Sequence, residues 1–339
     1  MQYRPWLEDA GFHVEYAALF DDAYLQKLYS GQKSKTDLLR YYRQRISKLR
    51  QRSKPNLVWL EYETLPWLPW MMEKALLPTS VPFVSDYDDA VFHRYDRHKL
   101  LPVRWFLGRK IDQVMQHSQL VTAGNTYLAD RARHACAERV EIVPTVVDLA
   151  QYTVRREPTV DSPLNVGWIG TPETWEAFGK SMHALLNDTL AVYGARFQAV
   201  GAKLAPQKIG TLDIVPWTEE TEVSAIQSMD IGVTPLKDTP WARGKCGYKL
   251  IQYMACGLPV VASSVGVNKD IVEHGVNGFL AETNEEWRSA IETLLSDAEL
   301  RRRMGAAGRK KVEESYSLQV WGPRVAQMLR EVASQGCKS

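Results

Sequence analysis

Short apolar runs alternate with longer segments of helical periodicity along most of the chain. The apolar runs predict strands, which lie at residues 12–19, 56–63, 81–90, 120–125, 164–170, 195–201, 212–217 and 231–235, at the start of 139–152 and after Pro259. The periodic segments predict helices, which lie at residues 2–11, 33–54, 100–117, 127–136, 173–186, 219–230, 284–317 and 317–332. Strands and helices alternate in both halves, which is typical of α/β domains built on parallel sheets.

The length of 339 residues suits two domains of Rossmann size. We expect a first domain at residues 1–152, a second at 153–316 and a closing helical segment at 317–339. Residues 155–163 have the polar, proline-containing composition of a linker. Because the first helix is already under way at the start of the chain, we expect the N-terminal domain to lack its first strand, as in a truncated gene product.

Residues 230–268 carry the strongest local signal. An apolar strand leads into a basic loop at residues 243–247, and a short helix begins near Tyr248. In a parallel sheet such a helix begins at the carboxyl edge, where free N–H groups and the helix dipole attract an anion such as phosphate. Lys245 and Lys249 add positive charge to the first turn. The segment is therefore predicted to bind a diphosphate; the alternative is a pair of solvated lysines.

The run KLIQYMACGLPVVAS, from Lys249 to Ser263, resembles the donor-site helix of the family 4 glycosyltransferases. This resemblance implies the GT-B fold, in which two Rossmann-like doubly wound domains face a central cleft and the last helix crosses back to the first domain. The family usually has two glutamates in this segment, and here Gly244 and Gln252 stand in their places. The resemblance implies that Gln252 binds the nucleotide ribose, through its amide. Gly244 has no side chain with which to contact the donor sugar.

The resemblance also assigns donor-binding roles to two glycine loops. Gly170 and Thr171 lie where the domains are expected to close on the donor phosphates. Gly266 and Asn268 match the family's loops near the donor sugar.

The remaining donor-side residues are cationic or aromatic. The family often carries an Arg and a Lys in the loop after Gly170, and their absence here moves the neutralising role onto Lys245 and Lys249, with Arg243 as a helper. Trp217 falls where the resemblance places the nucleotide base, and its indole either stacks on the base or packs in the core.

Three carboxylates, Asp86, Asp88 and Asp89, end the strand at residues 81–90. Ligands of doubly wound sheets bind at this end of the strands. The carboxylates are interpreted either as an N-cap with an acidic first turn or as acceptor-site groups, with Asp88 and Asp89 as the candidates. GT-B enzymes generally need no metal, and two carboxylates alone are a poor magnesium site, so no metal site is predicted.

Other residues near this strand end are weaker candidates. Glu61 is a candidate for orienting the acceptor, and His93 and His98 either join the site or serve as packing residues. Trp67 and Trp70 are interpreted as packing residues, with an acceptor platform as the alternative.

A basic segment at residues 33–54 has six apolar side chains at roughly helical spacing: Leu38, Leu39, Tyr41, Tyr42, Ile46 and Leu49. The pattern predicts one buried stripe beneath a solvated basic face. The alternative is a surface that meets anionic lipid headgroups or a polyprenyl diphosphate acceptor, which would bring the protein to the inner membrane surface.

Composition limits the classes of function. Hydrophobic residues make up 45% and charged residues 24%, which is typical of globular proteins. A net charge of +2 indicates no nucleic-acid partner. No apolar run is long enough to span a membrane, and no signal peptide is recognised, so we expect a cytoplasmic protein. Four scattered cysteines, Cys136, Cys246, Cys256 and Cys337, are expected to be free thiols.

Together these features predict a glycosyltransferase of the hexosyltransferase kind. It would move a sugar from a nucleoside diphosphate-sugar, its co-substrate, to a glycan, a lipid-linked acceptor or a small molecule, with retention and without a further cofactor. The alternatives are a nucleotide-sugar epimerase on the same fold and a non-catalytic nucleotide-sugar-binding protein.

Overall fold

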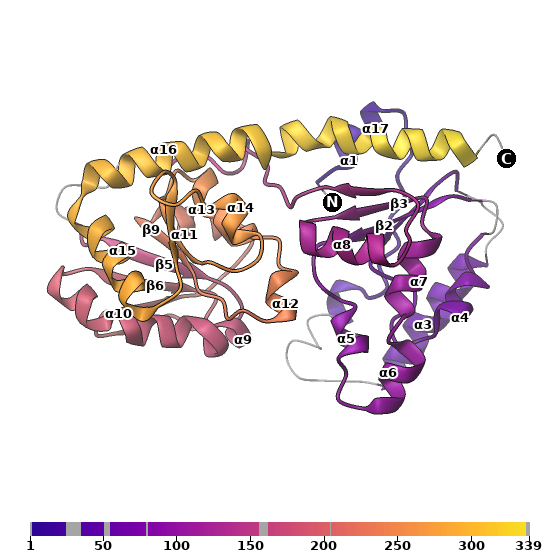
Figure 1. Ribbon diagram of the computed structural model, residues 1–339, viewed down its shortest axis with the longest axis horizontal. Coiled ribbons are helices and arrows are strands. Elements are labelled where there is room, and N and C mark those ends of the chain that lie inside the picture. The colour runs from indigo at the N-terminus through magenta and orange to yellow at the C-terminus, as the bar shows by residue number, and fades with distance from the viewer. Residues whose placement is uncertain are drawn as a thin grey trace. The chain divides into compact units, whose positions relative to one another are not determined.

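The computed structural model (Figure 1) describes residues 2–24, 35–50, 55–78, 81–155, 162–203 and 205–336. The chain divides into two compact units. The first contains Met1–Val143 and Gly322–Ser339, and the second contains Pro144–Trp321. The first boundary lies before residue 152, at which we predicted the first domain to end. Val147 pairs with Ser317, and Tyr152 packs in the core of the second unit.

The first unit is built on four parallel strands in the order β1-β2-β3-β4. Its strands are β1 (Val58–Glu61), β2 (Phe83–Tyr87), β3 (Leu120–Ala123) and β4 (Val140–Ile142). Its helices are α1 (Arg4–Asp9), α3 (Lys35–Leu49), α4 (Trp70–Lys74), α5 (His93–Asp96), α6 (Leu101–Leu107), α7 (Lys110–His117) and α8 (Thr126–His134). The part of α17 (Leu318–Gly336) that belongs to this unit packs Val325, Leu329 and Val332 with Leu7 and Val84.

The second unit is built on seven strands in the order β11-β10-β9-β5-β6-β8-β7, all parallel except β7. Its strands are β5 (Asn165–Ile169), β6 (Arg196–Val200), β7 (Gln207–Ile209), β8 (Leu212–Val215), β9 (Ile231–Thr234), β10 (Val260–Ser263) and β11 (Gly278–Ala281). Its helices are α9 (Pro172–Thr174), the π-helix η1 (Trp175–Gly179), α10 (Lys180–Val192), α11 (Glu222–Gln227), α12 (Pro240–Arg243), α13 (Tyr248–Ala255), α14 (Asn268–Ile271), α15 (Asn284–Ser296) and α16 (Ala298–Ser315).

Helices cover both faces of the larger sheet, because its central strands are apolar on both sides. Val166 and Trp168 of β5 pack with side chains of α10 and α15. Ile169, the next residue, packs instead with side chains of α11, α13 and α16. All four residues of β9 and of β10 are buried, as expected for strands covered on both faces.

Several elements differ from the sequence expectations. Residues 12–19 form no strand: Phe12 and Val14 pack beside the cluster that α17 covers, without strand pairing. The segment 100–117 forms two helices, since the chain turns at Gly108 and Arg109. The predicted stripe of α3 is only partly buried, because Leu38 and Leu39 are exposed. Strand β7 lies in a segment for which we predicted no element.

The cysteines and the helix lengths agree with the expectations where the structure describes them. Cys136, Cys246 and Cys256 are free thiols, and Cys337 lies outside the described residues. Within the described parts of the chain, no helix is long and apolar enough to cross a bilayer.

A close backbone contact fixes α16 against the segment after α13 and provides a test of this packing. A Cβ at Gly305 would lie 2.0 Å from the carbonyl oxygen of Gly257. We expect Gly305→Ala to lower the free energy of unfolding by about 1–3 kcal/mol, despite the higher helix propensity of alanine. Urea denaturation checks this, with the exposed Arg303→Ala of the same helix as a near-neutral control. An unchanged midpoint for Gly305→Ala would contradict the contact.

Candidate functional site

The candidate donor site lies at the carboxyl edge of the larger sheet, where the strand order reverses. From β5 the chain builds β6, β8 and β7 on one side, and then β9, β10 and β11 on the other. Loops that leave β5 and β9 in opposite directions create the crevice in which doubly wound sheets bind ligands. The loop after β5 contains Gly170 and Thr171, and the loop after β9 leads through α12 to α13.

The amino end of α13 is open to an anion. Gly247 precedes the helix with a left-handed φ of 70°, and a Cβ there would lie 2.3 Å from the side chain of Ile271, so glycine is required. No side chain caps the helix. Among the described residues, the N–H groups of Tyr248 and Lys249 have no acceptor. These two donors and the helix dipole provide a small positive potential.

Lys249 is the central residue of this edge. Its ammonium lies 4.7 Å from the centroid of the Trp168 ring, and a Cβ at Gly170 would come within 2.7 Å of its Nζ. Burial, and then repulsion by Lys245, lowers the pKa of Lys249 to about 8. No described carboxylate forms an ion pair with it. A desolvated cation without a counter-ion is unfavourable, and a bound anion would remove that cost.

The other predicted cations differ in their surroundings. Lys245 holds its ammonium 5.9 Å from the centroid of the Trp241 ring. Arg243 makes a two-pronged ion pair with Asp238, at 2.7 and 2.8 Å. The guanidinium of Arg243 is therefore already engaged with a carboxylate, whereas Lys249 is not.

Glu222 gathers the polar groups behind the amino end of α13. Its carboxylate accepts hydrogen bonds from Nε2 of Gln252 at 2.7 Å, from the indole N–H of Trp217 at 2.7 Å and from the hydroxyl of Tyr152. The hydroxyls of Tyr152 and Tyr248 lie 3.3 Å apart. Burial, followed by the hydrogen bond to Glu222, raises the pKa of Tyr152 above its usual range. Gln252 is almost fully buried, and Trp217 is half-exposed. Glu222 orients both side chains, because its carboxylate accepts a hydrogen bond from each of them.

The remaining predicted donor residues shape the loops. Thr171 caps α9 by accepting the N–H of Thr174 at 3.3 Å. Gly266 lies against the backbone of Arg243, since a Cβ at Gly266 would lie 3.0 Å from the carbonyl oxygen of Arg243. Gly244, which follows Arg243 in the chain, is buried. Asn268 is buried and donates to the Ser263 carbonyl at 3.0 Å, so its amide stabilises the loop after β10.

The sequence analysis did not identify four residues that shape this edge: Tyr152 as a site residue, Trp168, Glu222 and Tyr248. Glu222 is the most informative of them, because the sequence predicted only that it lies in the helix at residues 219–230. Glu222 and Gln252 lie thirty positions apart in the sequence, so no local pattern predicts their contact. Helical spacing alone gave no signal that could have found this pair.

At the carboxyl edge of the first unit, acidic side chains of two neighbouring strands gather. Glu61 ends β1 opposite Asp86 of β2. Burial, together with the charge of Glu61, raises the pKa of Asp86 to about 6, although the hydroxyl of Thr122 donates to this carboxyl group. Asp88 is exposed and accepts from the hydroxyl of Tyr62.

The other acceptor-side candidates lie near this edge or serve the fold. Asp89 is half-buried just beyond Asp88. His93 bridges Asp96 and Tyr127, each at 2.8 Å, so both ring nitrogens have partners. Trp70 is buried in the core, as predicted for a packing residue, whereas Trp67 is half-exposed. The two tryptophans, for which we predicted the same role, therefore differ in their surroundings. The described residues contain no group of side chains arranged to hold a metal.

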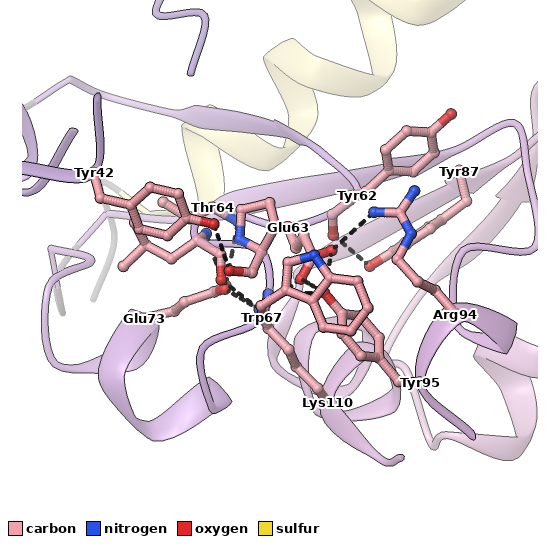
Figure 2. A network of polar contacts seen from close by, with 12 residues as sticks. Tyr42, Tyr62, Glu63, Thr64, Trp67, Glu73, Tyr87, Arg94, Tyr95 and Lys110 are labelled. Carbon is pink, nitrogen blue, oxygen red and sulfur yellow. Dashed lines mark hydrogen bonds and ion pairs between the residues drawn. The ribbon is translucent and has the colours of Figure 1, made fainter. Parts of the chain in front are cut away.

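The loop between β1 and α4 is held by buried polar groups (Figure 2). Tyr62 and Trp67 both have positive φ, at 61° and 64°, which costs free energy for side chains of this kind. Four backbone groups between them are bound by side chains: Glu73 accepts the N–H groups of Thr64 and Leu65, Lys110 donates to the Leu65 carbonyl, and Tyr42 donates to that of Pro66. The loop therefore presents the Trp67 ring in a defined position.

Lys110 is the centre of this network. It is fully buried and lies 2.5 Å from a carboxylate oxygen of Glu63 and 2.7 Å from one of Glu73. Burial raises the pKa of Glu73 despite the attraction of Lys110. The hydroxyl of Tyr95 donates to Glu63 and accepts from the N–H of Trp67 at 3.0 Å. Glu73 thus depends on this one cation among the described residues, whereas Glu63 also lies 3.8 Å from the guanidinium of Arg94.

Comparison with known proteins gives matches that lie mainly in the second unit. Residues 211–311 match the family described as Glycosyl transferases group 1. The spore coat protein SA of Bacillus subtilis is 35% identical over 82 residues, 23% of this chain and 21% of that protein. The N-acetyl-alpha-D-glucosaminyl L-malate synthase of Bacillus anthracis is 36% identical over 72 residues, 21% of this chain and 19% of that protein. The match therefore spans about a fifth of each relative.

Solved structures cover more of the chain at lower identity. Sucrose-phosphate synthase from Thermosynechococcus elongatus matches 88% of this chain and 79% of its own, with a TM-score of 0.66 at 14% identity. The Anabaena protein HepE, in complex with UDP-glucose, matches 92% and 90%, with a TM-score of 0.63 at 15% identity. The two units thus define a protein of the GT-B glycosyltransferase fold. Within the chain, the match to the glycosyltransferases of group 1 is carried by residues 211–311, in the second unit.

The buried network of the first unit makes a test of the loop. We expect Lys110→Met to lower the free energy of unfolding by about 3–5 kcal/mol, since it leaves the buried Glu73 without its cation and Glu63 with only the more distant Arg94. Lys74→Met, at an exposed position of the adjacent α4, is the matched control. Adding Glu73→Gln to Lys110→Met should recover part of the loss in urea denaturation. Equal stability of the two single variants would contradict the role of Lys110.

Proposed function

We propose that this protein is a glycosyltransferase that moves a sugar from a nucleoside diphosphate-sugar to an acceptor bound by the first unit, with retention at the anomeric carbon. The observation that carries the proposal is Lys249, a desolvated ammonium beside the open amino end of α13 and without an ion-pair partner among the described residues. A diphosphate would supply the missing negative charge.

The proposed role of this site is to stabilise the leaving group. Breaking the bond between sugar and phosphate builds negative charge on the diphosphate. Lys249, the N–H groups of Tyr248 and Lys249, and the nearby Lys245 would bind that charge more tightly in the transition state than in the ground state. Because Arg243 is engaged with Asp238, we assign it no share of this role.

The nucleoside would lie beside the Glu222 network. Trp217 offers a half-exposed indole, and Glu222 holds its N–H, so the ring orientation is defined before a ligand arrives. Gln252 and Tyr152 are buried behind it, next to the ribose position that the resemblance implies for Gln252. HepE, which shares the fold, was crystallised with UDP-glucose, and UDP is therefore the first ligand to test.

The acceptor would bind at the carboxyl edge of the first unit. The Trp67 ring gives an apolar face of the kind that packs on sugars, and the carboxylates of Asp88, Asp89 and Glu61 lie on the same edge to bind hydroxyl groups. A glycan or a lipid-linked sugar fits this chemistry. In a retaining reaction the departing phosphate can take the acceptor proton, so no separate base is required.

One observation favours a second candidate, a nucleotide-sugar-binding protein without turnover. Gly244 stands where the resemblance expects a carboxylate on the donor sugar, and it is buried without a side chain. Hydrolysis or transfer of radiolabelled sugar from a UDP-sugar, with acceptor extracts supplied, would exclude this candidate. Tight binding with no product would favour it.

Substituting Lys249 should lower the affinity for UDP and raise the stability of the unliganded protein. Lys249→Met should weaken UDP binding by roughly 10- to 100-fold, because it removes a desolvated cation from the phosphate site. The same change should raise the stability of the unliganded protein by about 2 kcal/mol at pH 7, since the lowered pKa shows that the charged form is disfavoured in the fold. Calorimetry and thermal unfolding measure the two effects. Lys180→Met, an exposed lysine paired with Glu176, is the control.

The same lysine predicts a pH dependence. Its pKa of about 8 means that the unliganded protein loses this charge as the pH rises through 8, whereas a bound phosphate favours the charged form. The affinity for UDP should therefore be highest below pH 8 and fall towards tenfold per pH unit above it. The fall should be absent in Lys249→Met. A flat profile in the unaltered protein would remove the main support for the proposal.

A further inference from the structure

Helix α6 carries apolar side chains on all sides. Its sequence, LPVRWFL, contains one polar residue, Arg104. Val103 and Leu107 face the interior, whereas four large apolar side chains at and before the helix face outward. The outward-facing residues are Leu100, Leu101, Trp105 and Phe106, with exposed fractions of 61%, 68%, 80% and 66%. We name these four residues the α6 patch.

Such a patch is unusual on a protein surface. A helix that is apolar all round is normally buried, and contiguous exposed apolar surface marks an interaction site. Leu101 and Trp105 are one helical turn apart, and the rings of Trp105 and Phe106 pack edge-on with centroids 4.4 Å apart. Figure 1 shows α6 at the end of the first unit far from α17. The patch is therefore one continuous surface on a projecting part of this unit.

Positive charge surrounds the α6 patch. Residues 97–109 contain Arg97, Lys99, Arg104 and Arg109 and no acidic residue. All four side chains are exposed, and none forms an ion pair with a carboxylate of the described residues. Cations of this kind around an apolar centre match an anionic surface with an apolar interior.

Helix α3, which we predicted as the alternative membrane surface, fits less well. Its cations are partly engaged: Lys48 pairs with Glu15 at 2.7 Å, and Arg45 donates to the carbonyl of Ala17 at 2.6 Å. Its exposed apolar residues, Leu38 and Leu39, include no aromatic side chain. The features expected of a membrane-facing segment meet on α6 instead.

We propose that the α6 patch binds the surface of an anionic lipid bilayer, with Leu100, Leu101, Trp105 and Phe106 inserted at the level of the headgroups and the four cations on lipid phosphates. Tryptophan is enriched at that level, because its ring is apolar and its N–H is polar. A symmetric contact with a second copy would bring the same cations together and is disfavoured by repulsion. The inference is independent of the transfer reaction.

Vesicle flotation of the full-length protein tests the proposal. The probes are phosphatidylcholine vesicles with and without phosphatidylglycerol. We expect binding to the anionic vesicles, and a roughly tenfold or greater loss of affinity for Trp105→Ser with Phe106→Ser. Lys99→Gln with Arg104→Gln should lose about fivefold for each cation removed, and high salt should have the same effect.

Matched control variants distinguish binding by the α6 patch from nonspecific hydrophobic or electrostatic binding to vesicles. Val192→Ser with Tyr193→Ser removes an exposed apolar pair of the second unit, and Arg303→Gln with Lys310→Gln removes two exposed cations there. Both should bind vesicles like the unaltered protein, and thermal unfolding verifies that every variant is folded.

Three outcomes would overturn the proposal. One is vesicle binding that survives the loss of Trp105 and Phe106. Another is equal binding to neutral and anionic vesicles. The third is an absence of vesicle binding together with a dimer that becomes a monomer in the Trp105 and Phe106 variant, which would assign the patch to a second copy of the chain.

Discussion

Lys249, a cation without an ion-pair partner among the described residues, is the centre of the proposed donor site. Lys249 lies beside Gly170, over the ring of Trp168 and at the open end of α13, where burial lowers its pKa to about 8. The fold holds this charge in an unfavourable place, and either loss of the proton or a bound anion relieves the cost. A side chain at Gly170 would come within 2.7 Å of the Lys249 ammonium, so the loop after β5 passes this close to the cation only because it carries a glycine there. At the proposed donor site, affinity for phosphate and loss of stability would therefore have the same physical origin.

In the first unit, by contrast, the central buried cation has carboxylate partners. Lys110 is fully buried between Glu63 and Glu73, and Lys110 and Glu73 bind the backbone of a loop that contains two residues with positive φ. Here the charges neutralise one another and serve to hold a shape. The shape places Trp67 and the acidic edge of β1 and β2 where a sheet of this kind binds its ligand. Paired charge thus supports one site, and unpaired charge forms the other.

The α6 patch is the proposed membrane contact of the first unit. It lies on the unit to which we assign the acceptor, and its apolar centre and basic surround match an anionic bilayer. An enzyme held at such a surface would meet a lipid-linked acceptor in two dimensions and at high local concentration. The lipid-linked class of acceptor and the patch therefore support each other, although they rest on different residues.

The sequence alone determined most strands and helices, the group 1 family resemblance and the importance of the segment from β9 to α13. Apolar periodicity and glycine positions are local properties, and they report local structure reliably when an element is covered on both sides. Residues 12–19 were predicted wrongly as a strand, because an apolar run does not reveal whether a neighbouring strand is present to pair with it. Only the tertiary structure decided which charges are paired. Lys110 meets Glu63 and Glu73, and Glu222 meets Gln252, across long stretches of chain, whereas Lys249 meets no carboxylate among the described residues. Such contacts depend on how the strands order and the helices pack, which no local pattern specifies.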